Sequence, residues 1–559
     1  MFKRFTAAVT LAAIGLQASS APLPRLEQRG HTTQFMVDDK PFLMLGGELH
    51  NSSASSNDYM APIWPRLKKM NLNTVVTTVS WELTEPTEGR FDFSSLDSQL
   101  EAARAQGLRL VVIWFGAYKN ARSTYAPGWV RKDTSRFPRV AINQTKPEFF
   151  NYKGAMPNPV LSPFSAQLQT AERRAFSALA AHLKVADPDH TVVMLQVDNE
   201  VGLLGDSKDR SPIAQAAWNA QVPAQLMTYL ARHRAALRPE LLAVWGRQQF
   251  REKGTWEQVF GKDWQAEEIF MAWGYGAHIE ALAQGARKEL PLPMYVNAWL
   301  GPQPGQLQAG DYPSGGPVPR VLDIWKAAAP SLSLLAPDIY VDDVTGVLKD
   351  YHRPDNPIFV PEAKFKTAGL FWGVGKHKAL GWSVFGVEDG APNNQMAQAY
   401  GILASMSDLV LRAQERDTIR GVLLDHDEAV TESLGGYGLS IRRMSPLLKQ
   451  IMLDAGVTAP SAAPAGESKP AASAPASANA KSFGMIIAGE PSEFYLVGQD
   501  YTVDFSRNGR LAEVDFVEEG SFKDGKWVPG RRLNGDERLL LLPVQGIGVL
   551  RMKLLEPAP

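Results

Sequence analysis

Eight short apolar runs, separated by stretches of helical periodicity, constrain the fold of this 559-residue chain most strongly. Each run is four to eight residues long, which is typical of a parallel strand buried on both faces. The runs are Phe42–Gly47, Thr74–Val79, Leu108–Phe115, Thr191–Val197, Met294–Asn297, Leu332–Ile339, Ile358–Pro361 and Leu380–Phe385.

Helical patterns fill most of the intervals between these runs. They cover Leu96–Gln106, Ala166–Val185, Ile213–Arg234 and Ala266–Lys288. Alternating strands and helices predict right-handed crossovers and a parallel sheet. Eight repeats favour an α/β fold of the (β/α)8 TIM-barrel type. An open doubly wound sheet is the alternative, although no glycine-rich phosphate loop follows the first run.

The composition changes sharply near the C-terminal end. Residues 458–482 are rich in Ala, Pro and Ser and show no apolar periodicity, so we expect an extended linker. This linker would separate a barrel domain over 25–457 from a small domain over 483–559. The small domain alternates apolar and polar residues and has a turn signal at Asn508-Gly509, which predicts an antiparallel β domain.

The N-terminus has the order of a secretory signal peptide. Lys3 and Arg4 precede the apolar run Phe5–Leu16, and small residues follow at 18–21. We therefore expect a signal peptide over 1–21 and a secreted or periplasmic protein. An uncleaved membrane anchor is the alternative, but the run is short for a bilayer span.

Charge and cysteine content exclude several classes of function. The formal net charge is −1, so nothing indicates nucleic acid or an anionic membrane as a partner. The chain has no cysteine, which excludes thiolate nucleophiles and cysteine-ligated metals. The nine histidines are scattered and form no H-E-x-x-H motif, so we predict no metal and no cofactor. The oligomeric state is left open.

Two glutamates close different strands of the expected barrel. In a TIM barrel the active site lies at the carboxyl ends of the strands. The fourth run leads into Glu200 and the seventh into Glu362. Hydrolysis of an acetal with retention needs two carboxyl groups, one to protonate the leaving oxygen and one to attack the anomeric carbon. We predict Glu200 and Glu362 as that catalytic pair.

Other strand ends carry residues suited to a sugar ligand. Aromatic faces stack on sugar C–H surfaces, and carboxylates or amides bind hydroxyl groups, so a carbohydrate is the expected partner. Trp81 and Trp382 are equally compatible with packing inside the fold. The candidate substrate-binding residues at these ends are Glu48, Trp81, Asn120, Trp299 and Trp382.

A longer block carries a family resemblance. The segment from Trp81 through Glu85-Pro86 to Phe93 resembles the W-x-x-x-E-P-x-x-G-x-F-D-F block of glycoside hydrolase family 35. Gly46–His50, Gln196–Gly202 and Pro361–Ala363 resemble that family's first-strand, acid/base and nucleophile blocks, so the resemblance covers roughly residues 35–400.

The resemblance implies a (β/α)8 barrel and a retaining exo-β-galactosidase. It implies that Glu200 is the acid/base and Glu362 the nucleophile, that Asn199 binds the sugar 2-hydroxyl and that Tyr340 hydrogen-bonds the nucleophile. The region after the linker is similar to that of bacterial members that act on galactosylated plant cell-wall polysaccharides such as xyloglucan.

Two departures from the family pattern leave the sugar specificity open. The third strand end reads Ala117-Tyr118-Lys119-Asn120 where many members have Ala-Glu-Trp. The acid/base block ends Glu200-Val201-Gly202, without the tyrosine that is usual in the family. Another retaining β-glycosidase of the same clan is therefore an alternative. A non-catalytic carbohydrate-binding protein and a metallohydrolase are weaker alternatives, because both carboxyl groups are present and no metal motif is.

Overall fold

The computed structural model describes residues 21–143, 160–425, 428–454, 482–539, 541–544 and 546–555. Apart from Ala21, the expected signal peptide lies outside these residues, and apart from Ser482, so does the expected linker. Among the described residues, no helix is long and apolar enough to cross a membrane.

Eight parallel strands form a barrel, in the order β10-β11-β4-β5-β6-β7-β8-β9. The barrel closes between β9 and β10, where Ile339 forms a parallel bridge with Ala363 and donates its N–H to the Glu362 carbonyl over 2.8 Å. All eight predicted runs form these strands. The strands are β4 (Met44–Glu48), β5 (Thr74–Ser80), β6 (Arg109–Lys119), β7 (Val192–Asn199), β8 (Met294–Ala298), β9 (Leu334–Pro337), β10 (Phe359–Val360) and β11 (Gly381–Phe385).

Apolar side chains fill the barrel interior and leave the carboxyl ends of the strands for polar groups. Val76, Ile113 and Tyr295 belong to one buried cluster. Phe35 and Val37 join it from an N-terminal antiparallel sheet. That sheet comprises β1 (Arg25–Arg29), β2 (Thr32–Val37) and β3 (Lys40–Pro41).

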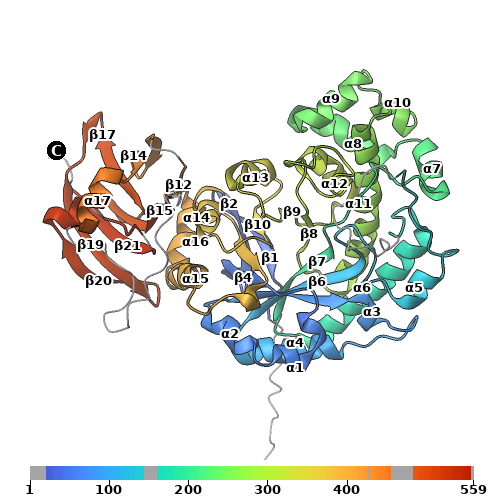
Figure 1. Cartoon of the computed structure of the whole chain (residues 1–559), viewed down its shortest axis with the longest axis horizontal. Coiled ribbons are helices and arrows are strands. Elements are labelled where there is room, and N and C mark those ends of the chain that lie inside the picture. The colour runs from blue at the N-terminus through green and yellow to red at the C-terminus, as the bar shows by residue number, and fades with distance from the viewer. Residues whose placement is uncertain are drawn as a thin grey trace, which may run out of the picture.

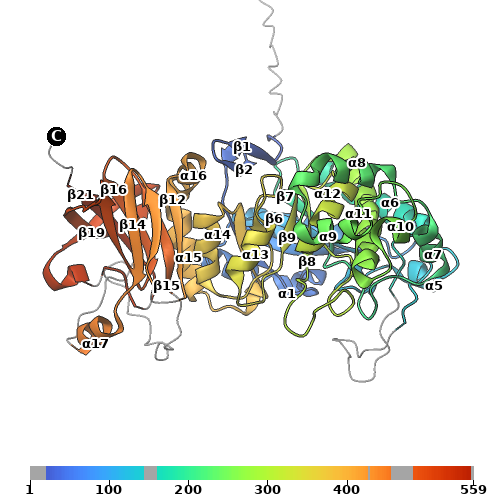
Figure 2. The same cartoon turned by 90° about the horizontal axis from the view of Figure 1, so that it is seen from above.

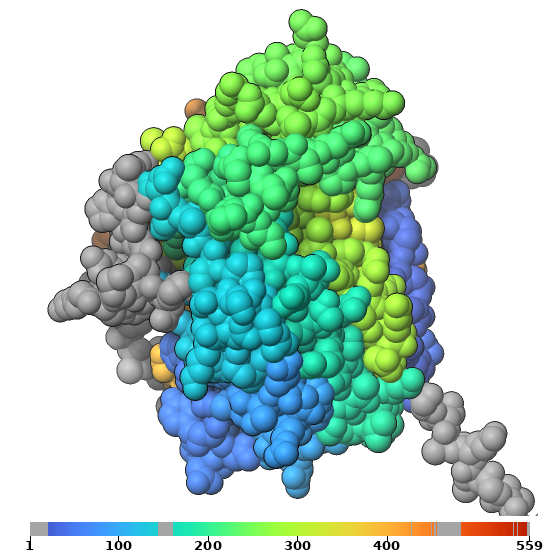
Figure 3. Space-filling view, turned by 90° about the vertical axis from the view of Figure 1, so that its right-hand side faces the viewer, coloured from blue at the N-terminus to red at the C-terminus, as the bar shows by residue number. Residues whose placement is uncertain are grey.

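Helices surround the barrel, as the periodicity predicts (Figure 1). The predicted helix over Ile213–Arg234 is divided in two before Pro223, because proline cannot donate the backbone hydrogen bond that a continuous helix needs. Helices α7 to α10 form the green upper part of the side face in Figure 3. The first set of helices is α1 (Asn57–Met60), α2 (Trp64–Lys69), α3 (Trp81–Thr84), α4 (Ser94–Gln106), α5 (Gly128–Lys132), α6 (Ala166–Ala186), α7 (Pro212–Asn219), α8 (Ala224–His233), α9 (Pro239–Arg247) and α10 (Trp256–Phe260). The second is α11 (Trp264–Glu289), α12 (Leu322–Ala328), α13 (Val344–Tyr351), α14 (Thr367–Lys376), α15 (Gln395–Ser405), α16 (Ser407–Arg416) and α17 (Pro446–Asp454).

The C-terminal region consists of two antiparallel sheets with a shared apolar core. One has the order β12-β15-β16-β21-β19-β20 and the other β13-β14-β17-β18. The predicted turn at Asn508-Gly509 connects β17 and β18, and both residues have positive φ. The strands are β12 (Ile419–Leu424), β13 (Val430–Leu434), β14 (Tyr437–Arg443), β15 (Ser482–Ala488), β16 (Glu493–Gln499), β17 (Tyr501–Arg507), β18 (Arg510–Leu511), β19 (Val514–Lys523), β20 (Lys526–Leu533) and β21 (Gly548–Leu554).

This pairing corrects the expected domain boundary at 457. Strand β12 pairs with β15, and β14 pairs with β17, so residues 419–443 belong to the C-terminal sheets rather than to the barrel. Such pairing across a long chain interval leaves no local sequence signal. Figures 1 and 2 show the sheets, in orange and red, lying beside α14, α15 and α16. Phe483 of β15 stacks on Phe371 of α14 with ring centroids 5.6 Å apart, so the C-terminal region packs against the barrel.

Candidate active site

Glu200 and Glu362 meet at the barrel mouth. Glu200 directly follows β7, and Glu362 follows β10 after one proline. Both are buried, at 7% and 4% exposure. With Asp338, which follows β9, each contributes a carboxyl oxygen to a group in which all three oxygens lie within 4.8 Å of one another. The tertiary structure therefore unites two residues that are 162 positions apart in the sequence.

Two donors hold the Glu362 carboxyl group. The Tyr340 hydroxyl donates to Oε2 over 2.6 Å, and the Asn297 amide donates to Oε1 over 3.2 Å. The expected contact between Tyr340 and the nucleophile candidate is present. Burial first, and then the Glu362 charge, raises the pKa of the Tyr340 hydroxyl far above its usual value, so Tyr340 remains a donor. Hydrogen bonds of this kind favour the ionised form of a carboxyl group.

Glu200 lies in surroundings that favour its protonated form. Its backbone N–H donates to the Asn297 side-chain oxygen over 2.9 Å, and its φ of 44° is unusual for a non-glycine residue. Burial, followed by the nearby Glu362 charge, raises the pKa of Glu200 to about 7. Lys119, Asp338 and Asn199 oppose this shift. A carboxyl group with such a pKa can donate a proton near neutral pH.

Glu48 and Asp338 add two further buried carboxyl groups. Burial and the Glu362 charge raise the pKa of both well above its usual value. Among the described residues, no N–H or O–H group donates to either oxygen of Glu48. The Asn297 amide donates to Asp338 over 2.8 Å. Glu48 therefore lies beside Glu200 and Glu362 at the barrel mouth.

Lys119 places a buried positive charge beside these carboxyl groups. Its ammonium group donates to the Asn199 side-chain oxygen over 3.2 Å when the amide of Asn199 is oriented to accept it. Its charge lowers the pKa of Glu48, Glu200 and Asp338 relative to burial alone. Asn120 lies next to it and donates its N–H to the Asn199 carbonyl over 3.1 Å. The structure therefore places Asn199, Asn120 and Lys119 together beside Glu200.

The three candidate tryptophans differ in their positions. Trp299 follows β8, is half-buried, and donates to the Gln306 side chain over 3.2 Å. Trp81 has no exposed surface and donates to Glu85 over 2.8 Å within the hydrophobic core. Trp382 is 1% exposed and packs against α14, where Gly369 and Gly373 leave room for its ring.

Trp81 and Trp382 are therefore packing residues, and their assignment to substrate binding is corrected. The reason for Trp382 is strand alternation, since neighbouring side chains of a barrel strand face opposite sides. Trp382 faces the helices, so Phe385, three positions later on β11, faces the other side. Phe385 contacts His50 edge-on with ring centroids 5.2 Å apart.

Several site residues were not assigned a role from the sequence. Asn297 and Asp338 close β8 and β9, so their strand-end positions were a usable signal. Tyr295 lies in the barrel interior, where its electrostatic neighbours are Glu48, Asp338 and Glu362. Strand alternation along β8 places the side chains of Tyr295 and Asn297 on the same face of the strand. The two-residue spacing alone does not show whether that face points into the barrel or toward the surrounding helices.

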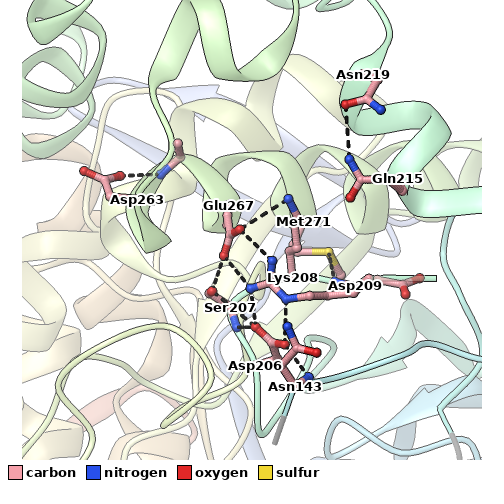
Figure 4. Close-up of polar contacts among 12 residues, drawn as sticks. Asn143, Asp206, Ser207, Lys208, Asp209, Gln215, Asn219, Asp263, Glu267 and Met271 are labelled. Carbon is pink, nitrogen blue, oxygen red and sulfur yellow. Dashed lines mark hydrogen bonds and ion pairs between the residues drawn. The ribbon is translucent and has the colours of Figure 1, made fainter. Parts of the chain in front are cut away.

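The loop after Glu200 is anchored by a network of ion pairs (Figure 4). Arg210 binds Asp206 over 2.7 Å and Glu267 of α11 over 2.9 Å. Lys208 reaches Glu267 over 3.2 Å and lies 3.8 Å from the centroid of the Trp218 ring. These contacts connect the loop to α11, so they restrain the chain directly after the acid/base candidate.

The oxygens of Glu200, Asp338 and Glu362 are also spaced closely enough to hold a cation. Asn297 and Tyr340, however, already donate hydrogen bonds to Glu362, and Asn297 donates to Asp338. Donors directed at these oxygens suit carboxyl groups that act on a sugar better than they suit metal ligands, whose oxygens must face the ion. Two nearly buried carboxyl groups at the strand ends of one barrel are the arrangement that glycoside hydrolases use.

Comparisons with known proteins agree with that class. Residues 53–252 match the family model of glycoside hydrolase family 42, described as β-galactosidase, and residues 396–543 match a domain of unknown function, DUF5597. A β-galactosidase from Xanthomonas manihotis is 33% identical over 108 residues, which is 19% of this chain and 18% of that protein. The human β-galactosidase-1-like protein 3 is 31% identical over 119 residues, or 21% of this chain and 18% of that protein.

A solved family 42 β-galactosidase from G. stearothermophilus has a TM-score of 0.44 and 15% identity, covering 66% of this chain and 57% of that one. Of the two sequence relatives, the β-galactosidase from Xanthomonas manihotis and the human protein, the chain spans only about a fifth of the length. The chain is similar to β-galactosidase-like glycoside hydrolases, as predicted. The matching model is that of family 42, which differs from the family 35 assignment made from the motifs.

Proposed function

We propose that this protein is a retaining exo-acting β-galactosidase. The observation that carries the proposal is the pair Glu200 and Glu362, whose carboxyl oxygens approach within 4.8 Å at the barrel mouth. Retaining enzymes place their carboxyl groups about 5–5.5 Å apart, whereas inverting enzymes need roughly 6.5–9.5 Å to admit water. The short approach supports retention.

The surroundings of the two glutamates support different roles. Glu362, which accepts hydrogen bonds from Tyr340 and Asn297, attacks the anomeric carbon and forms a glycosyl-enzyme intermediate. Glu200, whose pKa is raised to about 7, protonates the leaving oxygen. When the intermediate forms, the Glu362 charge is lost, so Glu200 ionises more readily and activates water for the second step.

Exo action and a galactosyl substrate rest on two observations. The catalytic carboxyl groups are almost entirely buried, which suits a single terminal sugar better than the interior of a polymer. The matched family model and relatives are described as β-galactosidases. The resemblance of the C-terminal region to bacterial enzymes of plant cell-wall breakdown suggests galactosylated side chains, such as those of xyloglucan, as the natural substrate.

A panel of chromogenic β-glycosides tests the proposal, with the galactoside included and with chelator added in parallel. We expect the galactoside to be cleaved fastest, no effect of chelator, and a first-formed product with the β configuration by NMR. Glu362→Gln should abolish this activity, and Glu200→Gln should reduce it least for glycosides with activated leaving groups, while the exposed Glu101→Gln of α4 serves as the matched control.

A different retaining β-glycosidase is the second candidate. The presence of Lys119 and Asn120 at the third strand end, where many family 35 members have Ala-Glu-Trp, favours it. Faster cleavage of another β-glycoside in the same panel would select this alternative. Inversion of the product configuration would exclude both.

A further inference from the structure

Strand β6 bulges where it reaches the barrel mouth. Trp114 pairs with Val197 of β7, but the next pair is Lys119 with Asn199, so four residues of β6 lie opposite one residue of β7. The bulge brings Asn120 and the following Ala121 against the acid/base segment, where Ala121 donates its N–H to the Glu200 carbonyl over 3.2 Å. Bulges redirect side chains and leave backbone groups outside the ladder.

Two buried carboxyl groups bind the amides of this bulge. The Ala117 N–H donates to Oε1 of Glu172 over 2.7 Å, and the Tyr118 N–H donates to Oδ1 of Asp198 over 3.1 Å. Glu172 belongs to α6, and Asp198 lies two positions before Glu200. Gly116 allows this approach, because a Cβ there would overlap both carboxyl groups.

Glu172 is surrounded by donors. Besides Ala117, the Trp114 indole donates to Oε1 over 3.1 Å, and His278 Nε2 of α11 lies 2.7 Å from Oε2. A carboxylate can accept about four hydrogen bonds. An Asp198 carboxyl oxygen lies within 4.8 Å of both Glu172 and His278, and Oδ2 of Asp198 is buried and accepts no hydrogen bond from the described residues, so Asp198 is the group placed to supply the fourth.

A hydrogen bond between two carboxyl groups requires one proton. Burial, followed by the Glu172 charge, raises the pKa of Asp198 well above its usual value, which favours the protonated form of Asp198. The other titratable groups that face this pair are Tyr118 of β6, Tyr275 of α11 and Asp209 of the loop after β7.

We propose that protonated Asp198 donates to Glu172, and that Asp198, Glu172 and His278 together are positioning residues for the acid/base Glu200. This inference rests on the proposed function. The cluster fixes the bulge of β6 against the end of β7, where Asp198 and Glu200 both have positive φ, at 56° and 44°. Such backbone conformations persist only when the surrounding structure holds them. Without the cluster, the strand end relaxes and Glu200 loses its position beside the leaving oxygen.

Two substitutions separate this role from simple packing. In Asp198→Asn the amide can still donate to Glu172 and accept from Tyr118, so we expect kcat/KM to stay within about threefold of the original enzyme, with the basic limb of its pH profile unmoved. In Glu172→Gln an amide NH2 group replaces one of the two acceptor oxygens. That NH2 group then faces a donor, either His278 or the pair Ala117 and Trp114, and the hydrogen bond at that position is lost. We expect kcat/KM to fall at least about tenfold for a disaccharide galactoside, and far less for galactosyl fluoride, whose leaving group needs no proton.

Three results would overturn the inference. An equal loss on both substrates in Glu172→Gln would indicate only a smaller folded fraction. A basic limb shifted to lower pH in Asp198→Asn would show that Asp198 carries a negative charge in the original enzyme. A metal ion found with the purified protein and lost in Asp198→Asn would assign the cluster to a cation instead.

Infrared spectroscopy tests the proton without any substrate. The difference between the original enzyme and Asp198→Asn at neutral pH should contain the C=O stretching band of a protonated carboxyl group, and its absence would contradict the inference. This measurement does not depend on turnover. If the protein were inactive on every glycoside, the proposed function would be refuted, but the infrared difference would still show whether Asp198 is protonated.

Discussion

Tyr340 donates its hydroxyl hydrogen to Oε2 of Glu362 over 2.6 Å, while Asn297 occupies the other oxygen of the same carboxyl group. Glu362 is thereby oriented from the end of β9, the strand next to its own, and from the end of β8, one strand further along the barrel. If Glu362 is the nucleophile, these two donors fix the direction in which its carboxyl group points.

Removal of the Tyr340 hydroxyl should therefore slow the reaction more than it weakens binding. A hydrogen bond to a charged group contributes about 1.5–3 kcal/mol, so we expect Tyr340→Phe to lower kcat by about tenfold to a hundredfold with little change in KM. Steady-state kinetics on an aryl galactoside would measure this, with the exposed Tyr59→Phe as control. An unchanged kcat would mean that Tyr340 does not assist Glu362.

The two glutamates should respond differently to replacement by alanine. Glu362→Ala should abolish turnover, because no covalent intermediate can form, and added azide should restore it by giving the α-glycosyl azide. Glu200→Ala should impair substrates with poor leaving groups far more than activated aryl glycosides, and its azide product should keep the β configuration. NMR of the products decides the assignment, and exchanged configurations would reverse the two roles.

The pH profile should report the proton on Glu200. Its raised pKa of about 7 means that the acid form is present below pH 7 and is lost as the pH rises through that value, so kcat/KM should decline on the alkaline side. The positive charge of Lys119 lowers this pKa, so Lys119→Met should move the alkaline limb to higher pH. Lys184→Met, exposed at the far end of α6, should leave the limb in place. A shift to lower pH would contradict the electrostatic assignment.

Gly116 should tolerate no side chain. A methyl group there would overlap Glu172 and the Trp114 indole, and forcing extra atoms into a packed interior costs about 1–3 kcal/mol or more. We expect Gly116→Ala to lower Tm and the free energy of unfolding. Gly128→Ala, where a Cβ would meet no heavy atom within 4 Å, is the matched control. Equal Tm values for the two variants would show that the cluster beside β6 can rearrange.

We propose that the protein is exported, because its N-terminus has the order of a signal peptide. N-terminal sequencing of protein from the native host should find a first residue near 19–22, in the periplasm or the medium. Unprocessed protein in the cytoplasm would contradict this proposal.

Much of the barrel was predictable because its signals are local. Each buried parallel strand is a short apolar run, and all eight runs form strands within a few residues of their expected bounds. The strand-end rule also identified Glu200, Glu362 and Glu48, since all strands of a parallel barrel place their carboxyl ends at the same mouth.

The sequence by itself determined the barrel, its paired glutamates and the antiparallel character of the C-terminal region. The tertiary structure decided what depends on contacts between distant segments. It directed Trp382 toward α14, paired β12 with β15 across the expected linker, and brought Glu172, Asp198 and His278 together behind the bulge of β6. The direction of a side chain and the protonation of a buried carboxyl group depend on neighbours that are remote in sequence, and no local pattern encodes those neighbours.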